Sequence, residues 1–231
     1  MSYDAGTGSR RETQLGRLSA TNRVEAFSDG VMAIAITLLV LELKVPTKAD
    51  AADGQLLIRL LERWPSYVAY LAAFLTIGII WLNHHTLLSK IARFDARLHW
   101  LNLLLLLGVA TLPFPTALIA EHVGDGGWNA SVAAAAYGLT ATLMALPWSF
   151  VWRHLADHPE LLEPGYDAAH ARAELRRGVL GVPIYAAATA VSFVAPLVAL
   201  GLYAGIAALY AVTSQGWTDP GPGTARSETA E

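Results

Sequence analysis

The 231-residue sequence contains no cysteine, so neither a disulfide framework nor thiolate chemistry is available to it. Charged residues make up only 15% of the chain, against about 25% in soluble domains. The sequence also lacks HExxH, GxSxG and any Cys/His ligand set, the patterns typical of hydrolases and metal sites. Because 54% of the residues are hydrophobic, the composition favours an integral membrane protein over a soluble domain.

Six apolar segments are candidates for membrane-spanning helices. The last two are continuous in sequence and would reach about 51 Å as one helix, which exceeds a bilayer core. We therefore predict two short helices separated by a turn near Pro196, with a single long kinked helix as the alternative. The prolines at Leu112–Pro115 and at Pro147 should kink the third and fourth segments. The predicted segments are 26–43, 64–82, 98–119, 129–152, 178–195 and 197–213.

Lysine and arginine gather on one side of this predicted bundle. Of the 16 in the chain, four lie on the other side: Lys44, Lys48, Arg59 and Arg63. The positive-inside bias therefore predicts a multi-pass protein of the cell membrane with both termini in the cytoplasm. Residues 1–22 would form a polar cytoplasmic segment, 23–213 the six-span domain, and 214–231 a disordered cytoplasmic tail rich in Gly, Pro, Ser and Thr.

The first apolar segment lies within Arg23–Pro46 (RVEAFSDGVMAIAITLLVLELKVP) and carries Asp29 one turn inside its apolar run. An ionisable group at membrane depth is costly, which makes it a functional-site hypothesis. A helical wheel places Ala33, Ile36 and Val40 on the face of Asp29. We expect that face to bury the carboxylate against polar partners. The roughly opposite face carries Phe27, Gly30, Ile34, Thr37, Leu38 and Leu41.

Polar residues from three predicted helices should reach the same membrane depth, because the first and third helices start where the second ends. Buried polar groups need partners, so we expect Asp29 to accept hydrogen bonds from Arg23, Ser28 or the Asn83–His85 segment. A packing lock without ion contact is the simplest role for Asp29. The full network is expected to comprise Arg23, Phe27, Ser28, Asp29, Asn83, His84, His85 and Asn102.

The two adjacent histidines, His84 and His85, have three possible roles: structural hydrogen bonding, pH sensing and metal binding. Adjacent histidines on a helix point about 100° apart, and the i, i+4 spacing of zinc sites is missing. We therefore expect no metal site here.

The motif Arg23-x-x-x-Phe27-Ser28-Asp29, followed by an Ala/Ile/Leu run, resembles the signature of the transmembrane-protein-175 family of potassium channels in its short bacterial form. The Leu112–Pro115 and Trp81–His85 runs also resemble that family. There the first helix lines the pore, and bulky aliphatic residues constrict it in place of a TVGYG filter, which this sequence lacks. The resemblance implies pore constrictions at Ile34, Leu38 and Leu41, with Thr37 supporting selectivity. Without the resemblance, packing against lipid or within the core is enough to explain why Ile34, Leu38 and Leu41 are apolar.

The resemblance thus implies a potassium-over-sodium channel. We predict an all-α membrane protein with six transmembrane helices, and the resemblance implies a homotetramer around a pore lined by the first helix. Its partners would be further copies of the chain, the lipid bilayer and permeant K⁺, with no cofactor, no nucleic acid and no enzymatic activity. One alternative is a proton-coupled secondary transporter with Asp29, His84 and His85 as a relay, although no internal repeat is visible. The other is an intramembrane enzyme.

Overall fold

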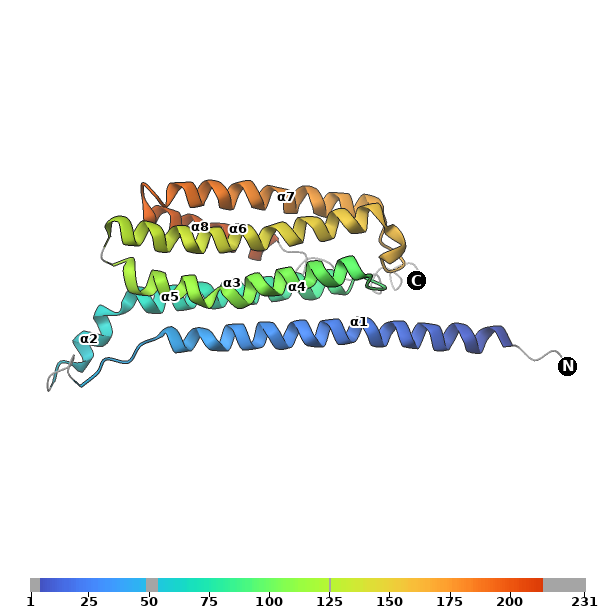
Figure 1. The fold of residues 1–231 in the computed structure, drawn as a ribbon, viewed down its shortest axis with the longest axis horizontal. Coiled ribbons are helices and arrows are strands. Elements are labelled where there is room, and N and C mark those ends of the chain that lie inside the picture. The colour runs from blue at the N-terminus through green and yellow to red at the C-terminus, as the bar shows by residue number, and fades with distance from the viewer. Residues whose placement is uncertain (1–4, 49–53, 125, 214–231) are drawn as a thin grey trace, which may run out of the picture.

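The computed structural model of the chain is an all-helical bundle whose long helices run along one common axis (Figure 1). The structure describes residues 5–48, 54–124 and 126–213. Its elements, in chain order, are α1 (Ala5–Leu38), the 3₁₀ turn η1 (Leu39–Glu42), α2 (Leu56–Glu62), α3 (Trp64–Leu88), α4 (Ala96–Thr111), α5 (Pro113–His122), α6 (Gly127–Asp157), the 3₁₀ turn η2 (Pro159–Leu161), α7 (Ala168–Val191) and α8 (Pro196–Thr213).

Four segments of the described chain are long and apolar enough to cross a membrane: Thr21–Glu42, Ser66–Leu88, Ala96–His122 and Gly127–Asp157. Pro196–Tyr210 is a shorter apolar helix. The four segments agree with the first four predicted spans and make this a multi-pass membrane protein.

The helix that contains the first span differs from its prediction at both ends. Helix α1 begins at Ala5, so the polar stretch predicted as a separate segment over 1–22 is helical from Ala5 and continuous with the span. At the other end the α-helix stops at Leu38, and Leu39–Glu42 wind as a tighter 3₁₀ turn. The short helix α2, in the connection that follows, was not predicted.

Prolines break the helices largely where predicted. The third segment is interrupted at Leu112, and α5 starts at Pro113, where a missing N–H costs no helical hydrogen bond. By contrast, α6 runs through Pro147 as one helix. The chain turns at residues 192–195 before α8 begins at Pro196, so the predicted division into two helices is correct.

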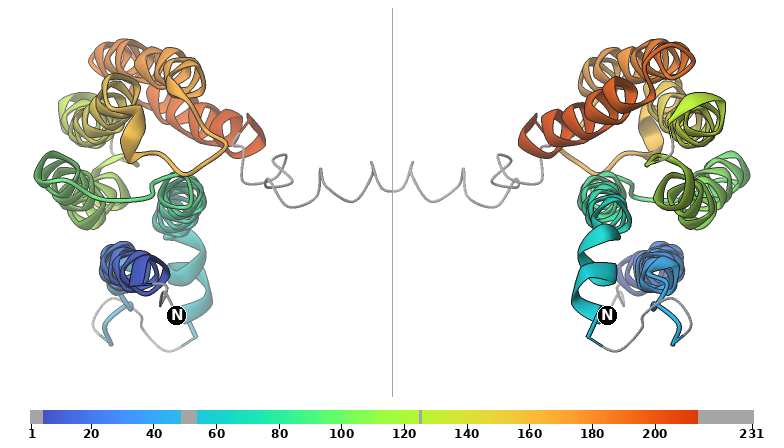
Figure 2. Two further views of the ribbon diagram at one scale, coloured as in Figure 1. Left: turned by 90° about the vertical axis from the view of Figure 1, so that its right-hand side faces the viewer. Right: turned by 90° about the vertical axis from the view of Figure 1, so that its left-hand side faces the viewer.

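Helix α1 lies at one edge of the bundle, on the side away from α7 (Figures 1 and 2). It contacts α3 and α4, while α6 and α7 pack along each other on the far side. The main apolar core lies between these layers and includes Met32, Leu39, Ile77, Val109 and Leu112. Within the described part of the chain, one broad side of α1 therefore has no neighbour.

A second apolar cluster, around Leu98 and Leu155, closes the end of the bundle where α3 meets α4. Two loops pair there, since Ala92 N–H donates to Leu161 O at 2.8 Å and Glu163 N–H donates to Lys90 O at 2.9 Å. Lys90 is 2% exposed, and its Nζ lies 3.3 Å from His170 Nε2. The aromatic rings of Trp152 and Tyr166 also face this ammonium.

Asp95 begins α4 at the same end of the bundle. Its Oδ1 accepts the Leu98 N–H at 2.8 Å, and its Oδ2 accepts from His154 Nε2 at 2.6 Å. Partial burial opposes ionisation of this carboxyl group. The hydrogen bonds from Leu98 and His154 outweigh that effect and hold the pKa of Asp95 below its ordinary value of 3.8.

Asp95→Asn is expected to lower the unfolding free energy by about 1 kcal/mol at pH 7, because asparagine keeps the helix cap but loses the charge that faces His154. The folded pKa of Asp95 is depressed, so its contribution is present above 3.8 and is lost as pH falls through the folded value. Thermal unfolding of parent and variant between pH 7 and pH 3 measures this. A difference that persists unchanged in acid would contradict the ionic explanation.

Candidate functional site

Helix α1 has one buried face and one broad exposed face. The buried face consists of Ser28, Met32, Ala35 and Leu39, which pack toward α3 and α4. The predicted constriction residues lie on the exposed face. Ile34 is 61% exposed, Leu38 44% and Leu41 70%, and Thr37 is exposed between them. No other described residue of the same chain covers this row of four predicted residues.

The position of Asp29 differs from the wheel prediction. The buried face is centred roughly 90° from Asp29 on the wheel, so the carboxylate lies half-buried at the edge of that face. Ala33, predicted to be buried with it, is exposed. The reason is that α1 is apolar almost all round in this region. Its own sequence cannot indicate which side meets α3 and α4.

The 3₁₀ turn changes how the constriction residues align. Side chains three apart eclipse each other in 3₁₀ geometry, so Leu41 lies over Leu38 rather than rotated from it. Ile34 lies one helical turn before Leu38. The three residues therefore form an apolar column with steps of roughly 6 Å along the helix axis.

Thr37 is an exposed polar residue beside this apolar column. Its hydroxyl lies 2.9 Å from both Ala33 O and Ile34 O, so its proton is used within the helix. The lone pairs of Thr37 Oγ1 are then available to accept from water or to face a cation.

A buried chain of polar side chains joins α1, α3 and α4. Asn102 Nδ2 donates to Ser28 Oγ at 3.0 Å, and Ser28 Oγ donates to Val24 O at 2.8 Å. Asn102 Oδ1 lies 2.7 Å from His84 Nε2. Because an amide oxygen can only accept, His84 must carry its proton on Nε2. Its Nδ1 is buried and has no hydrogen-bond partner within the described residues.

A second, more open cluster surrounds Asp29. Trp81 Nε1 donates to Asp29 Oδ1 at 2.9 Å. The Trp81 ring stacks on His85, with centroids 6.2 Å apart, and His85 Nδ1 lies 2.9 Å from Glu25 Oε1. The expectation that Arg23, Ser28 or the Asn83–His85 segment donates to Asp29 is therefore wrong, because the indole provides that hydrogen bond.

The eight predicted network residues thus do not form one cluster. Ser28, His84 and Asn102 form the buried chain, while Asp29 and His85 belong to the open cluster. The other three lie apart. Arg23 and Phe27 are exposed on α1, and Asn83 lines a cavity between α3, α6 and α7. Sequence reasoning missed Trp81 and Glu25. The i, i+4 spacing of Trp81 and His85 on α3 could have suggested the first, whereas Glu25 contacts His85 between two helices and no sequence spacing indicates that pair.

The far end of the exposed column is fixed to the bundle. Lys44 forms an ion pair with Glu121 of α5, and Arg63 Nη1 donates to Lys44 O at 3.1 Å. The positive charge of Lys44 is therefore directed toward α5. The carboxyl group of Glu42, in the last residue of η1, is the acidic group closest in sequence to the column.

Comparison with known proteins places this arrangement in a family. The family model described as "Endosomal/lysosomal potassium channel TMEM175" matches residues 23–113, which include α3, α4 and the part of α1 from Arg23 onward. A potassium channel of Streptomyces collinus is 46% identical over 193 residues, covering 84% of this chain and 92% of that protein. A potassium channel of Chamaesiphon minutus is 40% identical over 196 residues, covering 85% and 96%.

A solved structure extends the similarity to three dimensions. It is the crystal structure of a lysosomal potassium-selective channel TMEM175 homolog from Chamaesiphon minutus. It superposes with a TM-score of 0.76 at 38% sequence identity, covering 85% of this chain and 98% of that one. Relatives of this identity and coverage, together with the family model, show that the chain belongs to the TMEM175 family of potassium channels.

Proposed function

We propose that the chain forms a homotetrameric, potassium-permeable channel that prefers potassium over sodium and is lined by α1. The observation that carries this proposal is the uncovered column of Ile34, Leu38 and Leu41, which lies opposite the buried face of the same helix. A single lining helix per chain cannot enclose a pore, so several copies must surround an axis. Bacterial relatives named potassium channels support the choice of ion.

In such an assembly each residue of the column becomes a ring. The Ile34 ring forms the tightest constriction, and the Leu38 and Leu41 rings follow at intervals of roughly 6 Å toward the outer side. Apolar rings can gate by dewetting, whereas a ring of Thr37 hydroxyls, with lone pairs directed outward, assists partial ion hydration. The chain contains no TVGYG segment that could replace this arrangement.

The full topology of the proposal has six spans and cytoplasmic termini. The spans are α1, α3, the α4–α5 pair, α6, α7 and α8, and the lysine and arginine bias gives the orientation. The first part of α7 carries four of the charged residues of the connection and lies toward the basic, cytoplasmic side.

The hydrogen bonds disfavour the proton-coupled transporter. Asp29 is linked to His85 through the Trp81 side chain, and an indole N–H only donates, so it cannot pass a proton on. The partner of His84 is Asn102, an amide, rather than Asp29. A relay through Asp29, His84 and His85 is therefore interrupted at two places within the described residues.

Purified protein reconstituted in bilayers is expected to carry a potassium current whose reversal potential shifts with the potassium gradient more than with the sodium gradient. Chemical crosslinking in mild detergent is expected to reach a limit of four subunits. A limit at one or two subunits would refute the shared axial pore. Flux that requires an opposing proton gradient would favour the transporter instead.

A further inference from the structure

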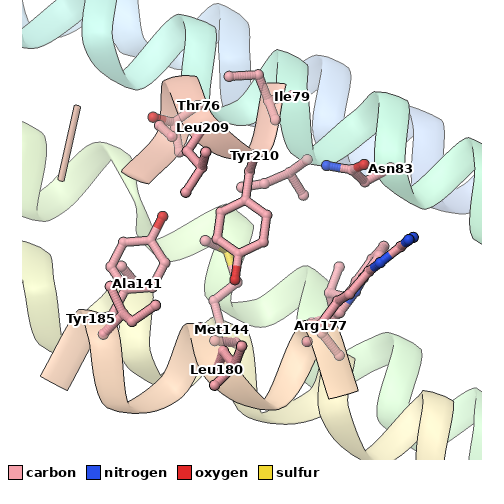
Figure 3. Close-up of a pocket in the computed structure, with 18 of the residues that line it drawn as sticks. Thr76, Ile79, Asn83, Ala141, Met144, Arg177, Leu180, Tyr185, Leu209 and Tyr210 are labelled. Carbon is pink, nitrogen blue, oxygen red and sulfur yellow. The ribbon is translucent and has the colours of Figure 1, made fainter. Parts of the chain in front are cut away.

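A cavity of about 670 Å³ inside the bundle has no part in the proposed pore. Helices α3, α6, α7 and α8 surround it, and Figure 3 shows Tyr210 directed into it. Its volume falls in the range of natural ligand sites, about 300–1,000 Å³. The cavity lies on the far side of α3 from α1, away from the proposed ion path.

The length of the cavity matches one leaflet of a bilayer. Its lining on α3 runs from Thr76 to the end of the helix near Lys90, about 21 Å at about 1.5 Å per residue. On α6 it runs from Tyr137 to Trp152, a similar length of about 22 Å. Half of a bilayer with its headgroups is about 20–22 Å.

The chemistry of the cavity changes along this length. Arg177 and the Asn83 amide lie at one end (Figure 3). Glu174, which pairs with Arg177, and Lys90, just beyond the end of α3, also line the cavity there. The rest of the lining is mainly aliphatic and aromatic. Two cations and one acid leave an excess of one positive charge. Arg177 Nη1 lies 3.2 Å from Glu174 Oε1, and its side chain is 64% exposed at the mouth. Lys90 lies at the buried floor.

From this juxtaposition we infer that the cavity is a binding site for an anionic phospholipid of the surrounding bilayer. The phosphate lies against Arg177 and the Asn83 amide, and the acyl chain extends between Met144, Leu180 and Tyr185. Basic pockets between transmembrane helices bind acidic headgroups in this way. A zwitterionic lipid fits this site less well, because it brings its own cation next to Arg177. A free fatty acid also fits less well, because it has no phosphate to place at headgroup depth.

Native mass spectrometry of the full chain tests the inference, with dioleoyl-phosphatidylglycerol, dioleoyl-phosphatidylcholine and oleic acid as separate probes. The parent is expected to retain one phosphatidylglycerol per chain in preference to the other two. Arg177→Gln is expected to weaken that binding about fivefold, which corresponds to about 1 kcal/mol per basic residue at an acidic lipid surface. The matched control is Arg176→Gln, since Arg176 is exposed and lies outside the cavity.

A second pair of variants tests the acyl-chain end. Ala145 lines the cavity, whereas Ala136 lies nine positions earlier on α6, about 180° around the helix. Ala145→Leu is expected to reduce phosphatidylglycerol retention, and Ala136→Leu is expected to leave it unchanged. Equal retention of phosphatidylcholine, a preference for oleic acid, or equal losses in the control variants would each overturn the inference. Because binding is measured without ion flux, a failure here is distinct from failure of the channel proposal.

Discussion

Ile34→Asn is expected to raise potassium current and to reduce the preference for potassium over sodium. In the proposed tetramer this substitution replaces the tightest apolar ring by amides that can hydrogen-bond to water. A gain on the order of tenfold corresponds to a barrier lowered by about 1.4 kcal/mol. A wetter passage also discriminates less between hydrated cations. Single-channel current and reversal potential in mixed potassium and sodium gradients measure both effects.

The matched control for this variant must be a similarly exposed aliphatic residue far from α1. Leu139 on α6 is suitable, because it is 54% exposed compared with 61% for Ile34. Ala33→Asn is a poor control, since Ala33 is itself exposed on α1. Leu139→Asn is expected to leave conductance unchanged. If Ile34→Asn matches the parent in both quantities, the exposed face of α1 does not line the pore.

Asn102→Leu is expected to cause the largest loss of stability among substitutions at the candidate site. It leaves His84 Nε2–H without an acceptor and removes the hydrogen bond to Ser28 Oγ, in a region with little access to water. Each unsatisfied buried group costs about 1–3 kcal/mol, so we expect a total of about 2–5 kcal/mol. Thermal unfolding in detergent and the oligomer peak in size-exclusion chromatography measure the effect.

The comparison variant is Asp29→Asn, which keeps an acceptor for Trp81 Nε1 at a half-buried position and should cost less. Ser28→Ala made in the Asn102→Leu background should cost less than Ser28→Ala alone, because the two residues share one hydrogen bond. Two results would show that the buried chain does not stabilise the assembly. One is that the stability costs of Ser28→Ala and Asn102→Leu add up in the double variant. The other is that Asp29→Asn loses more stability than Asn102→Leu.

Much of the fold follows from hydropathy and proline placement. The first four spans lie within a few residues of their predicted positions, and the turn before Pro196 separates the last two helices. These features depend on local chemistry. A membrane span requires a long enough apolar segment, and a helix breaks where proline lacks the backbone N–H for a helical hydrogen bond.

The details of the site depend on neighbours, and this is where sequence reasoning failed. A wheel shows that α1 has two faces, but α1 is apolar on both, so contacts with α3 and α4 decide which is buried. The partner of Asp29 is an example. A tryptophan near a span end suits an interfacial anchor as well as it suits a hydrogen bond to a carboxylate, so the position of Trp81 in the sequence does not indicate its contact with Asp29.

The buried chain from Ser28 through Asn102 to His84 also restricts how a pore of this kind could open. Sliding α1 by one turn, about 5.4 Å, would separate Ser28 from Asn102 and leave the Asn102 Nδ2 donor and the Ser28 Oγ acceptor unpaired. A displacement along the helix axis is therefore costly. Rotation or tilting of α1 together with α3 and α4 preserves the chain, as does unwinding beyond Leu38, where 3₁₀ geometry already replaces the α-helix. Opening should therefore change the diameter of the apolar rings while their order along the axis remains the same.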